Sequence, residues 1–527
     1  MAVQPSTVPP EQPVPQIPAW LARLDWVLGA VFLVLFWGLG LGIGPKGLAA
    51  VAGLVLGALS FLYPRSGLAI LIVTEAILTT ITYITSVSNV PGLRAEEGAI
   101  GWKLPYDTYV AMGALAILLT TWGGVIYQNL FTGTRWRLTT LEKTLLGYLL
   151  FATVWIVFSA INGAEYPRVI YDMHIIVLWA SAVLFGRLLD TKLDWWRAIA
   201  LMVLLSSAHW AVLLVELAVG HLMDNPSDIA DAMRLTLGGS PDITTTFVPV
   251  LLALEILVAE WSTSAQWVLR GSFALFTFRT FASLWRSAMG HWVISVALLW
   301  WLLGNSVDRA RLVKIVVVAF LFLIGLTGMA LVVKPSLRKM AQYAVQARVA
   351  DVTSQRSESK IEEEYRGGEA GSGSTTDRYR VLETLTAVDQ LQEDYLWGRG
   401  PGGTIRKRFA AAQTVHIENY LHNGYLWFIL KFGIFGMLGM IWVYARFFIA
   451  TRKALTTLTL EPWEKALTYG FAASIPPLLL FALTNNIIGT PMGMSFIAPA
   501  FGWMCRLERK AAEAPRADAG GAPRADL

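Results

Sequence analysis

Long apolar runs alternate with short polar stretches along nearly the whole chain. A helix that spans a membrane needs about 20 mainly apolar residues, and the pattern predicts about fourteen spanning helices between Trp26 and Cys505. They are expected at residues 26–44, 47–63, 67–86, 107–128, 141–161, 168–189, 196–220, 243–260, 265–282, 287–304, 311–333, 424–446, 463–485 and 490–505. The pattern therefore predicts an all-α, polytopic transmembrane helical bundle.

One long polar region interrupts this pattern before the last three predicted spans. We expect a disordered N-terminal tail, a transmembrane bundle, a large helical loop outside the membrane, C-terminal transmembrane helices and a disordered C-terminal tail. Their boundaries are 1–25, 26–333, 334–423, 424–505 and 506–527. The first tail is rich in proline and the last repeats Ala-Pro-Arg-Ala-Asp, and such compositions disfavour a packed fold.

The polar region itself predicts two helices, Ser336–Glu364 and Thr376–Tyr395. Between them, residues 367–374 are rich in Gly and Ser, which is typical of a flexible linker. The second helix is predicted to place three leucines on one face: Leu382, Leu385 and Leu391. That face needs a packing partner, and we expect the outer surface of the bundle to supply it.

Composition agrees with a membrane protein. The chain is 55% hydrophobic and 15% charged, which is too little charge to cover a soluble protein of this size. The net charge of +5 does not predict a nucleic-acid partner, because in a membrane protein the distribution of Lys and Arg matters more than their sum. A single cysteine, Cys505, excludes an intramolecular disulfide and a thiol metal cluster.

Lys and Arg gather in alternate loops, and positively charged loops stay on the cytoplasmic side of a membrane. This rule predicts that both termini are cytoplasmic and that the long polar loop lies outside. The first apolar run is too long for a cleavable signal and should remain as an anchor. The residues expected on the cytoplasmic side include Arg65, Arg135, Arg137, Arg187, Lys192, Arg197, Arg309, Arg311, Arg446, Arg452, Lys453, Lys465, Arg506, Arg509 and Lys510.

Arginines also recur at the predicted outer ends of helices, where the same rule should deplete them. These residues are Arg168, Arg234, Arg286 and Arg399. A planar guanidinium with several donors suits phosphate binding, whereas snorkelling to lipid head groups or capping a helix is the structural alternative. Arg286 is the strongest candidate because little loop surrounds it, and Arg279 either reaches the same place or is structural.

His422 and Asn423 stand where the polar region ends and an apolar run of helix length begins. An imidazole can accept or donate a proton near neutral pH, so His422 is a candidate general base, with a plain interfacial histidine as the alternative. Asn423 either orients the imidazole or caps the following helix. The spacing of His416, Glu418 and His422 permits a metal site, but the three groups do not obviously converge, and we predict no metal.

A glycine-rich segment, Gly398-Arg399-Gly400-Pro401-Gly402, precedes this histidine. It follows no strand of a βαβ unit and lies on the predicted outer side, which argues against nucleotide binding. It predicts either a tight turn that brings backbone N–H groups and Arg399 to an anion or a purely structural turn. Four glutamates fall in or near predicted spans, and their role stays open: Glu75, Glu216, Glu255 and Glu260.

Several of these segments resemble the O-antigen ligase and O-antigen polymerase family of bacterial membrane glycosyltransferases. The resemblance rests on the glycine-rich segment 398–402, on His422-Asn423-Gly424-Tyr425-Leu426 leading into Gly433-Ile434-Phe435-Gly436, and on Arg286. It is most specific between Gly398 and Met440, whereas the upstream helices agree mainly in number and hydropathy.

The resemblance implies a GT-C type helical bundle that transfers a glycan from a polyprenyl-pyrophosphate-linked donor to a lipid or glycan acceptor. The reaction would take place at the outer face of the bacterial inner membrane, as part of envelope biosynthesis, with no metal or other cofactor. In such a reaction His422 would take the proton of the acceptor hydroxyl. Arg286 would stabilise the leaving pyrophosphate together with Arg168, Arg234 or Arg399.

Ligation of a finished polysaccharide and polymerisation of repeat units differ only in the acceptor, and the sequence does not distinguish them. A transporter or flippase of lipid-linked sugars is the alternative from another class, favoured if the glutamates in the spans are essential. A non-catalytic protein of envelope assembly is a further alternative. Substitution of His422 and Arg286 distinguishes these hypotheses.

Overall fold

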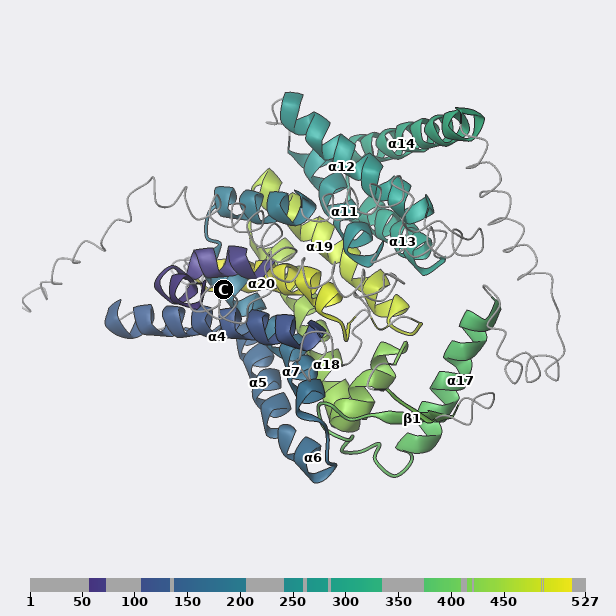
Figure 1. The fold of residues 1–527 in the computed structure, drawn as a ribbon. Coiled ribbons are helices and arrows are strands. Elements are labelled where there is room, and N and C mark those ends of the chain that lie inside the picture. Colours follow the sequence, from purple (N-terminus) through teal and green to yellow (C-terminus); the bar gives the residue numbers. More distant parts are fainter. Residues whose placement is uncertain are drawn as a thin grey trace, which may run out of the picture.

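The computed structural model describes residues 56–72, 106–132, 137–204, 241–258, 263–282, 286–333, 374–408, 415–418, 421–484, 486 and 488–513 of the 527-residue chain. Within these ranges the chain is helical apart from two short strands (Figure 1). Helices are α4 Tyr106–Thr132, α5 Thr140–Val154, α6 Ile156–Ile161, α7 Tyr166–Ala180, α8 Ala182–Leu188, α11 Pro241–Leu257, α12 Thr263–Ala282, α13 Arg286–Leu302, α14 Ser306–Val333, α17 Ser374–Leu391, α18 Gly424–Thr457, α19 Pro462–Phe481 and α20 Pro491–Glu513. The predicted all-α, polytopic class is confirmed.

Most predicted spans coincide with these helices, but two of them are divided. Trp155 separates α5 from α6, and Ser181 separates α7 from α8. Hydropathy cannot detect such a division, because the chain stays apolar through it. The two predicted tails, apart from the end of α20, lie outside the described residues. So do, wholly or in part, the predicted segments 26–44, 47–63, 67–86, 196–220 and Ser336–Glu364.

The predicted external loop contains a two-stranded antiparallel ribbon that the sequence did not predict. Strand β1, Ile405–Arg408, pairs with β2, Val415–Glu418, so that Ile405 lies opposite Glu418. Strands of four residues are too short to show a clear alternation of polar and apolar positions. The helical prediction for this region holds for α17 and misses the ribbon.

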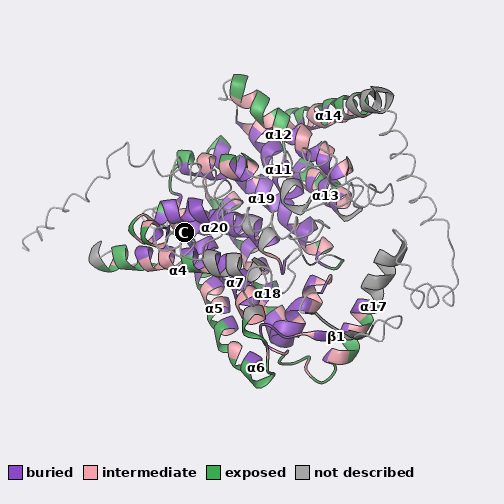
Figure 2. Ribbon diagram, in the orientation of Figure 1, coloured by how far each residue is buried: buried purple, intermediate pink, exposed green. Residues whose placement is uncertain are grey.

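Helices α18, α19 and α20 form the centre of the described bundle (Figure 1). On one side α11 and α13 pack on α19, with α12 and α14 beyond them; on the other, α5, α7 and α8 pack on α18 and α20. Burial follows this order, since the central helices are largely buried and α14 is largely exposed (Figure 2). Apart from Ser306, Arg311 and Lys314 near its start, the exposed side chains described for α14 are apolar, as expected of a helix that faces lipid. They include Val313, Val317, Leu321 and Ile324.

Three helical stretches among the described residues are long and apolar enough to cross a membrane. They are Thr140–Ile161, Arg168–Leu188 and Gly424–Thr457. Shorter apolar stretches occur in α4, α11 and α13, at Ala114–Leu130, Thr245–Leu257 and Ala288–Leu302. The chain is therefore a membrane protein by the composition of its helices.

Glycines let the central helices approach closely. A Cβ atom at Gly186 of α8 would lie 2.7 Å from the carbonyl oxygen of Gly502 in α20, and one at Gly470 of α19 would lie 2.5 Å from Cα of Val250 in α11. Both distances are far below van der Waals contact. Small residues are enriched where membrane helices touch. Lipid tails are as apolar as the side chains, so no hydrophobic effect drives helices together, and close backbone packing stabilises the contact instead.

Helix α18 is broken at Gly433, its tenth residue, where φ is 65°. In a regular helix the amide of Ile434 would donate to the carbonyl of Leu430. Here the Ile434 amide donates to the Tyr395 carbonyl, at 2.8 Å, and the Leu430 carbonyl accepts from the Arg399 amide, at 2.7 Å. Residues 395–403, which we call the 395–403 loop, thus supply both partners that the broken helix lacks, so the break leaves neither group unsatisfied.

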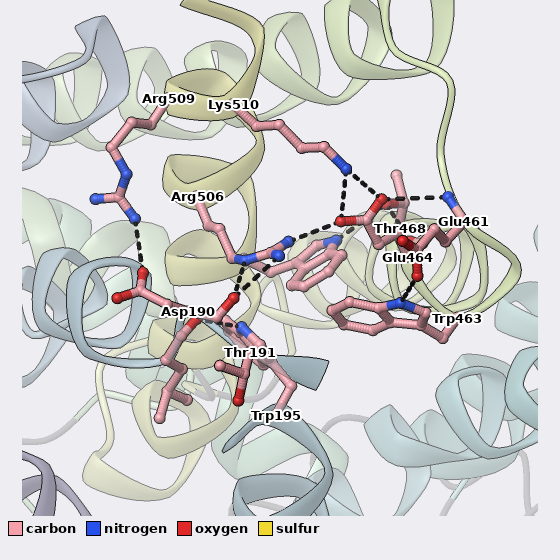
Figure 3. A network of polar contacts seen from close by, with 12 residues as sticks. Asp190, Thr191, Trp195, Glu461, Trp463, Glu464, Thr468, Arg506, Arg509 and Lys510 are labelled. Atoms are coloured by element: carbon pink, nitrogen blue, oxygen red, sulfur yellow. Dashed lines mark hydrogen bonds and ion pairs between the residues drawn. The ribbon is translucent and has the colours of Figure 1, made fainter. Parts of the chain in front are cut away.

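At the other end of the central helices, a network of charged side chains joins three helix ends (Figure 3). Glu464, near the start of α19, accepts from Arg506 at 3.1 Å and from Lys510 at 2.7 Å, both on α20. Arg509 pairs with Asp190, which follows α8, at 3.6 Å. These three basic residues belong to the set that the sequence predicts on the cytoplasmic side, and they lie together at one end of the bundle.

Replacing Gly433 with Ala should destabilise the protein strongly. Alanine is disfavoured at this positive φ, and its Cβ would overlap the carbonyl of Leu396. We expect thermal unfolding in detergent to show a loss of about 2–4 kcal/mol. Gly325→Ala in α14 is the matched control, because a Cβ there meets nothing within 4 Å. Equal melting temperatures for the two variants would contradict the account of the break.

Candidate functional site

His422 lies directly before α18 and is held by Glu383 of α17. The Nδ1 atom of His422 is 3.0 Å from Oε2 of Glu383, and the His422 backbone amide donates to the same oxygen at 2.7 Å. Glu383 is only 3% exposed, whereas the His422 side chain keeps 28% of its surface exposed. The pair therefore combines a buried carboxylate with a partly accessible imidazole.

Asn423 is the N-cap of α18. Its Oδ1 accepts from the backbone amides of Tyr425 and Leu426, at 3.0 and 3.1 Å. The next amide, that of Gly424, donates to the carbonyl of Ala482 after α19, at 2.7 Å. Of the two roles considered from the sequence, this geometry favours the cap, which satisfies amides that no helix carbonyl can reach. The cap also sets the position of the preceding His422.

Arg399 uses its guanidinium to hold the surrounding chain. Its Nε donates to Asp394 at 2.8 Å, Nη1 to the carbonyl of Thr404 at 2.7 Å and Nη2 to the carbonyl of Gln390 at 2.7 Å. A guanidinium has five N–H donors, so the two remaining donors are on Nη1 and Nη2. Most of the side chain is thus engaged in closing the 395–403 loop.

The other predicted phosphate-binding arginines occupy different surroundings. Arg168 of α7 pairs with Glu165 at 3.2 Å and is partly exposed, whereas Arg279 of α12 is 2% exposed. Arg286 is the first residue of α13, but its side chain is not among the described ones, and Arg234 lies outside the described residues. The structure therefore leaves Arg286 and Arg234 as predictions.

Helix α17 relates His422 to Arg399. Glu383 contacts the histidine, and the carbonyl of Gln390 accepts from the arginine. Seven residues of α-helix separate these two contacts, about 10 Å along the axis. Arg168 is connected from the other side, because its neighbour Val169 lies against Gly402 of the 395–403 loop. His422 thus contacts α17, Arg399 lies in the 395–403 loop and contacts α17, and Arg168 is next to a residue that packs on that loop.

Three glycines of the 395–403 loop each lie against a different helix. A Cβ at Gly398 would lie 2.5 Å from the amide nitrogen of Gly433, and one at Gly402 would lie 2.8 Å from a methyl carbon of Val169 in α7. Gly400 lies equally close to Ser159 of α6. This geometry favours the structural turn among the two alternatives, because the glycines serve close packing.

A buried ion pair that the sequence did not predict anchors the same loop. Lys431 of α18 and Asp172 of α7 are both essentially unexposed, and Nζ of Lys431 lies 2.7 Å from Oδ2 of Asp172. Lys431 also donates to the carbonyl of Gly403 at 2.6 Å, and the Gly402 amide donates to Asp172 at 2.5 Å. Charged residues are rare within membrane spans and are usually paired there. Asp172 and Lys431 fall in the predicted spans 168–189 and 424–446, so the sequence did contain a signal for this pair.

Glu383 was also missed, because α17 was oriented incorrectly from its leucines. From residue 383 on, where side chains are described, the buried positions of α17 are Glu383, Ala387 and Leu391, spaced four residues apart, whereas Leu385 is 60% exposed. The prediction that Leu385 shares a buried face with Leu391 is therefore wrong. A helix with few apolar residues shows no clear apolar face in its sequence. Hydropathy therefore places a carboxylate on the exposed side, even where a histidine pairs with it.

One of the four glutamates left open by the sequence has a described partner. Glu255 of α11 accepts from Nε of Arg270 in α12, at 2.7 Å. The pair joins two neighbouring helices and gives Glu255 a structural role. Glu75, Glu216 and Glu260 lie outside the described residues.

Replacing Lys431 with Met should destabilise the protein, because Asp172 would stay buried without its cation. Breaking such a pair costs about 3–5 kcal/mol, measurable as a lower midpoint of thermal unfolding in detergent. The double variant Lys431→Met/Asp172→Asn should recover part of this loss, since an Asn oxygen can still accept from Gly402. Lys453→Met, at an exposed position of the same helix, is the control. A loss no larger than in this control would contradict the anchoring role.

Comparison with known families gives one match within this region. Residues 271–441 match the family model described as O-antigen ligase. The matched segment runs from α12 into α18 and contains Arg279, Arg286, Arg399, His422 and Asn423. No curated protein matches the chain. Residues 271–441 are thus similar to an O-antigen ligase domain, and this match supports the predicted resemblance of the chain to the O-antigen ligase and polymerase family.

Proposed function

We propose that this protein is a glycosyltransferase of the bacterial inner membrane. It would transfer a glycan from a polyprenyl-pyrophosphate-linked donor to a hydroxyl group of a lipid or glycan acceptor, on the extracytoplasmic side. The observation that carries the proposal is the His422–Glu383 pair, 3.0 Å apart, within an O-antigen ligase domain. A partly exposed imidazole backed by a buried carboxylate is suited to general base catalysis.

The reaction needs one proton acceptor and one anion-binding group. The acceptor oxygen attacks the anomeric carbon of the donor, its proton passes to His422, and the bond from that carbon to the pyrophosphate oxygen breaks with its electron pair on the pyrophosphate. Charge that develops on this leaving group is best stabilised by preorganised cations in a water-poor site. We assign that role to Arg286, with contributions from Arg168, Arg234, Arg279 and Arg399.

The contacts of Arg399 and Asn423 limit the part that each can take in this reaction. Arg399 keeps only two guanidinium N–H donors beyond those bonded to Asp394, Thr404 and Gln390, so its contribution to a pyrophosphate is smaller than that of an arginine with all five. Asn423 acts through the helix cap that positions His422. Residues 334–423 are proposed as the extracytoplasmic region that carries these groups, with both termini in the cytoplasm.

The transporter alternative has less support than the transferase. It relied on carboxylates in the spans as proton or ion sites. The one that the structure describes, Glu255, is already paired with Arg270. The matched domain is, moreover, that of a ligase. Ligation and polymerisation remain distinct outcomes of the assay, decided by which acceptor is glycosylated.

His422→Ala should lower turnover about 10²–10⁴-fold, because the acceptor proton loses its base. Purified protein in liposomes would receive lipid-linked glycan and candidate acceptors, and the transferred glycan would be followed on gels. Gln392→Ala, at an exposed position just beyond α17, should keep wild-type turnover. Full activity of the His422 variant would remove the histidine from the mechanism.

Arg286→Lys should be impaired as well, because an ammonium group cannot reproduce the bidentate contact of a guanidinium with phosphate. We expect turnover to fall about 10²–10³-fold, the cost typical of a lost transition-state donor. The control is Arg452→Lys, which makes the same exchange at an exposed position of α18. If both variants turn over at the wild-type rate, Arg286 does not bind the leaving group.

A further inference from the structure

Glu383 is the least expected side chain at the site. It is a carboxylate in the interior of α17, 3% exposed, and the other buried residues in the described part of that helix, from residue 383 on, are Ala387 and Leu391. Burying an ionised carboxylate is costly unless strong hydrogen bonds compensate. The compensation at Glu383 includes two contacts to a single residue, His422.

Both contacts use the same oxygen. Oε2 of Glu383 accepts the backbone amide of His422 at 2.7 Å and lies 3.0 Å from its Nδ1. The first contact sets the position of the main chain before α18, and the second sets the rotation of the ring. Together with the Asn423 cap, they leave the imidazole little freedom of orientation. When Nδ1 carries the proton, Nε2 is the acceptor nitrogen of the ring.

We infer that Glu383 is a positioning residue of the proposed transferase, which keeps the proton of His422 on Nδ1 and so presents Nε2 to the acceptor hydroxyl. This inference rests on the proposed function. In the reaction the acceptor proton moves to Nε2, the imidazole becomes an imidazolium, and the carboxylate stays ionised and stabilises it. A base oriented by a third group in this way recurs on unrelated folds.

The competing interpretation is that Glu383 only fastens α17 to the start of α18. The two interpretations differ in what Gln should do at this position. Gln keeps the size of the side chain, and with its oxygen in the place of Oε2 it can still accept the His422 amide, so an anchoring role is largely preserved. It lacks the negative charge that stabilises the imidazolium, and with its NH2 group in that place it would instead donate to Nδ1 and stabilise the other tautomer.

The first experiment is kinetic. Glu383→Gln should lower kcat about 10²–10⁴-fold, as expected when a base loses its orienting carboxylate, with KM for the acceptor and the melting temperature close to the wild type. Glu393→Gln, at an exposed position beyond α17, should change none of the three. A wild-type kcat in Glu383→Gln, or a loss explained by lower stability, would overturn the inference.

A double-mutant cycle tests whether Glu383 acts through His422. In a His422→Ala background, Glu383→Gln should cause no further loss of kcat, because the group that it positions is gone. Two independent, multiplying losses would overturn the positioning role. An inactive wild-type protein would instead count against the proposed function itself.

The third experiment does not depend on activity. Histidine ¹⁵N spectra of the labelled wild type, with the His422→Gln variant used to assign the signal, report which ring nitrogen carries the proton. We expect the neutral ring of His422 to be protonated on Nδ1 in the wild type, and this preference to be weaker in Glu383→Gln. A neutral wild-type ring protonated on Nε2 would overturn the inference whether or not transfer is observed.

Discussion

The exchange of hydrogen bonds at Gly433 is the constraint on which the rest of the site depends. A helix inside a membrane has no water to satisfy a broken backbone bond, so a break survives only where other groups replace the lost partners. Here Tyr395 and Arg399 supply them through their own backbone groups. The exchange inserts the 395–403 loop into α18, which fixes the place of the loop relative to the start of that helix and to His422.

The buried charges strengthen the same junction. Lys431 lies two residues before the break, and its ion pair with Asp172 also binds the backbone of Gly402 and Gly403. Helices α7 and α18 and the 395–403 loop therefore share one hydrogen-bonded pair of charges. A pair of this kind adds little net stability by itself, because desolvation offsets most of the attraction. Its effect is to specify one arrangement, since any other arrangement leaves a charge unpaired.

The two ends of the central helices differ in their polar side-chain contacts. At one end Glu464, Asp190 and their arginine and lysine partners form a network of several ion pairs with both signs (Figure 3). At the other end His422 and Glu383 pair beside the 395–403 loop. A network of paired charges suits a structural role, whereas the imidazole of His422 is partly exposed. This difference supports chemistry at the His422 end.

The sequence by itself determined the class of this protein, because hydropathy is additive over a window of residues and needs no knowledge of what packs where. It also located His422 and the glycine-rich segment, since their composition is unusual at a boundary between polar and apolar chain. Only the tertiary structure decided that Glu383 faces His422, that Lys431 meets Asp172, and that Arg399 and Asn423 are engaged within the chain. Each of these pairs joins segments from different helices or loops, and local patterns carry no record of which distant groups meet. The break at Gly433 was also decided by the tertiary structure. In the sequence this glycine is one small residue of an apolar helix, and only the contacts with the 395–403 loop show that the helix breaks there.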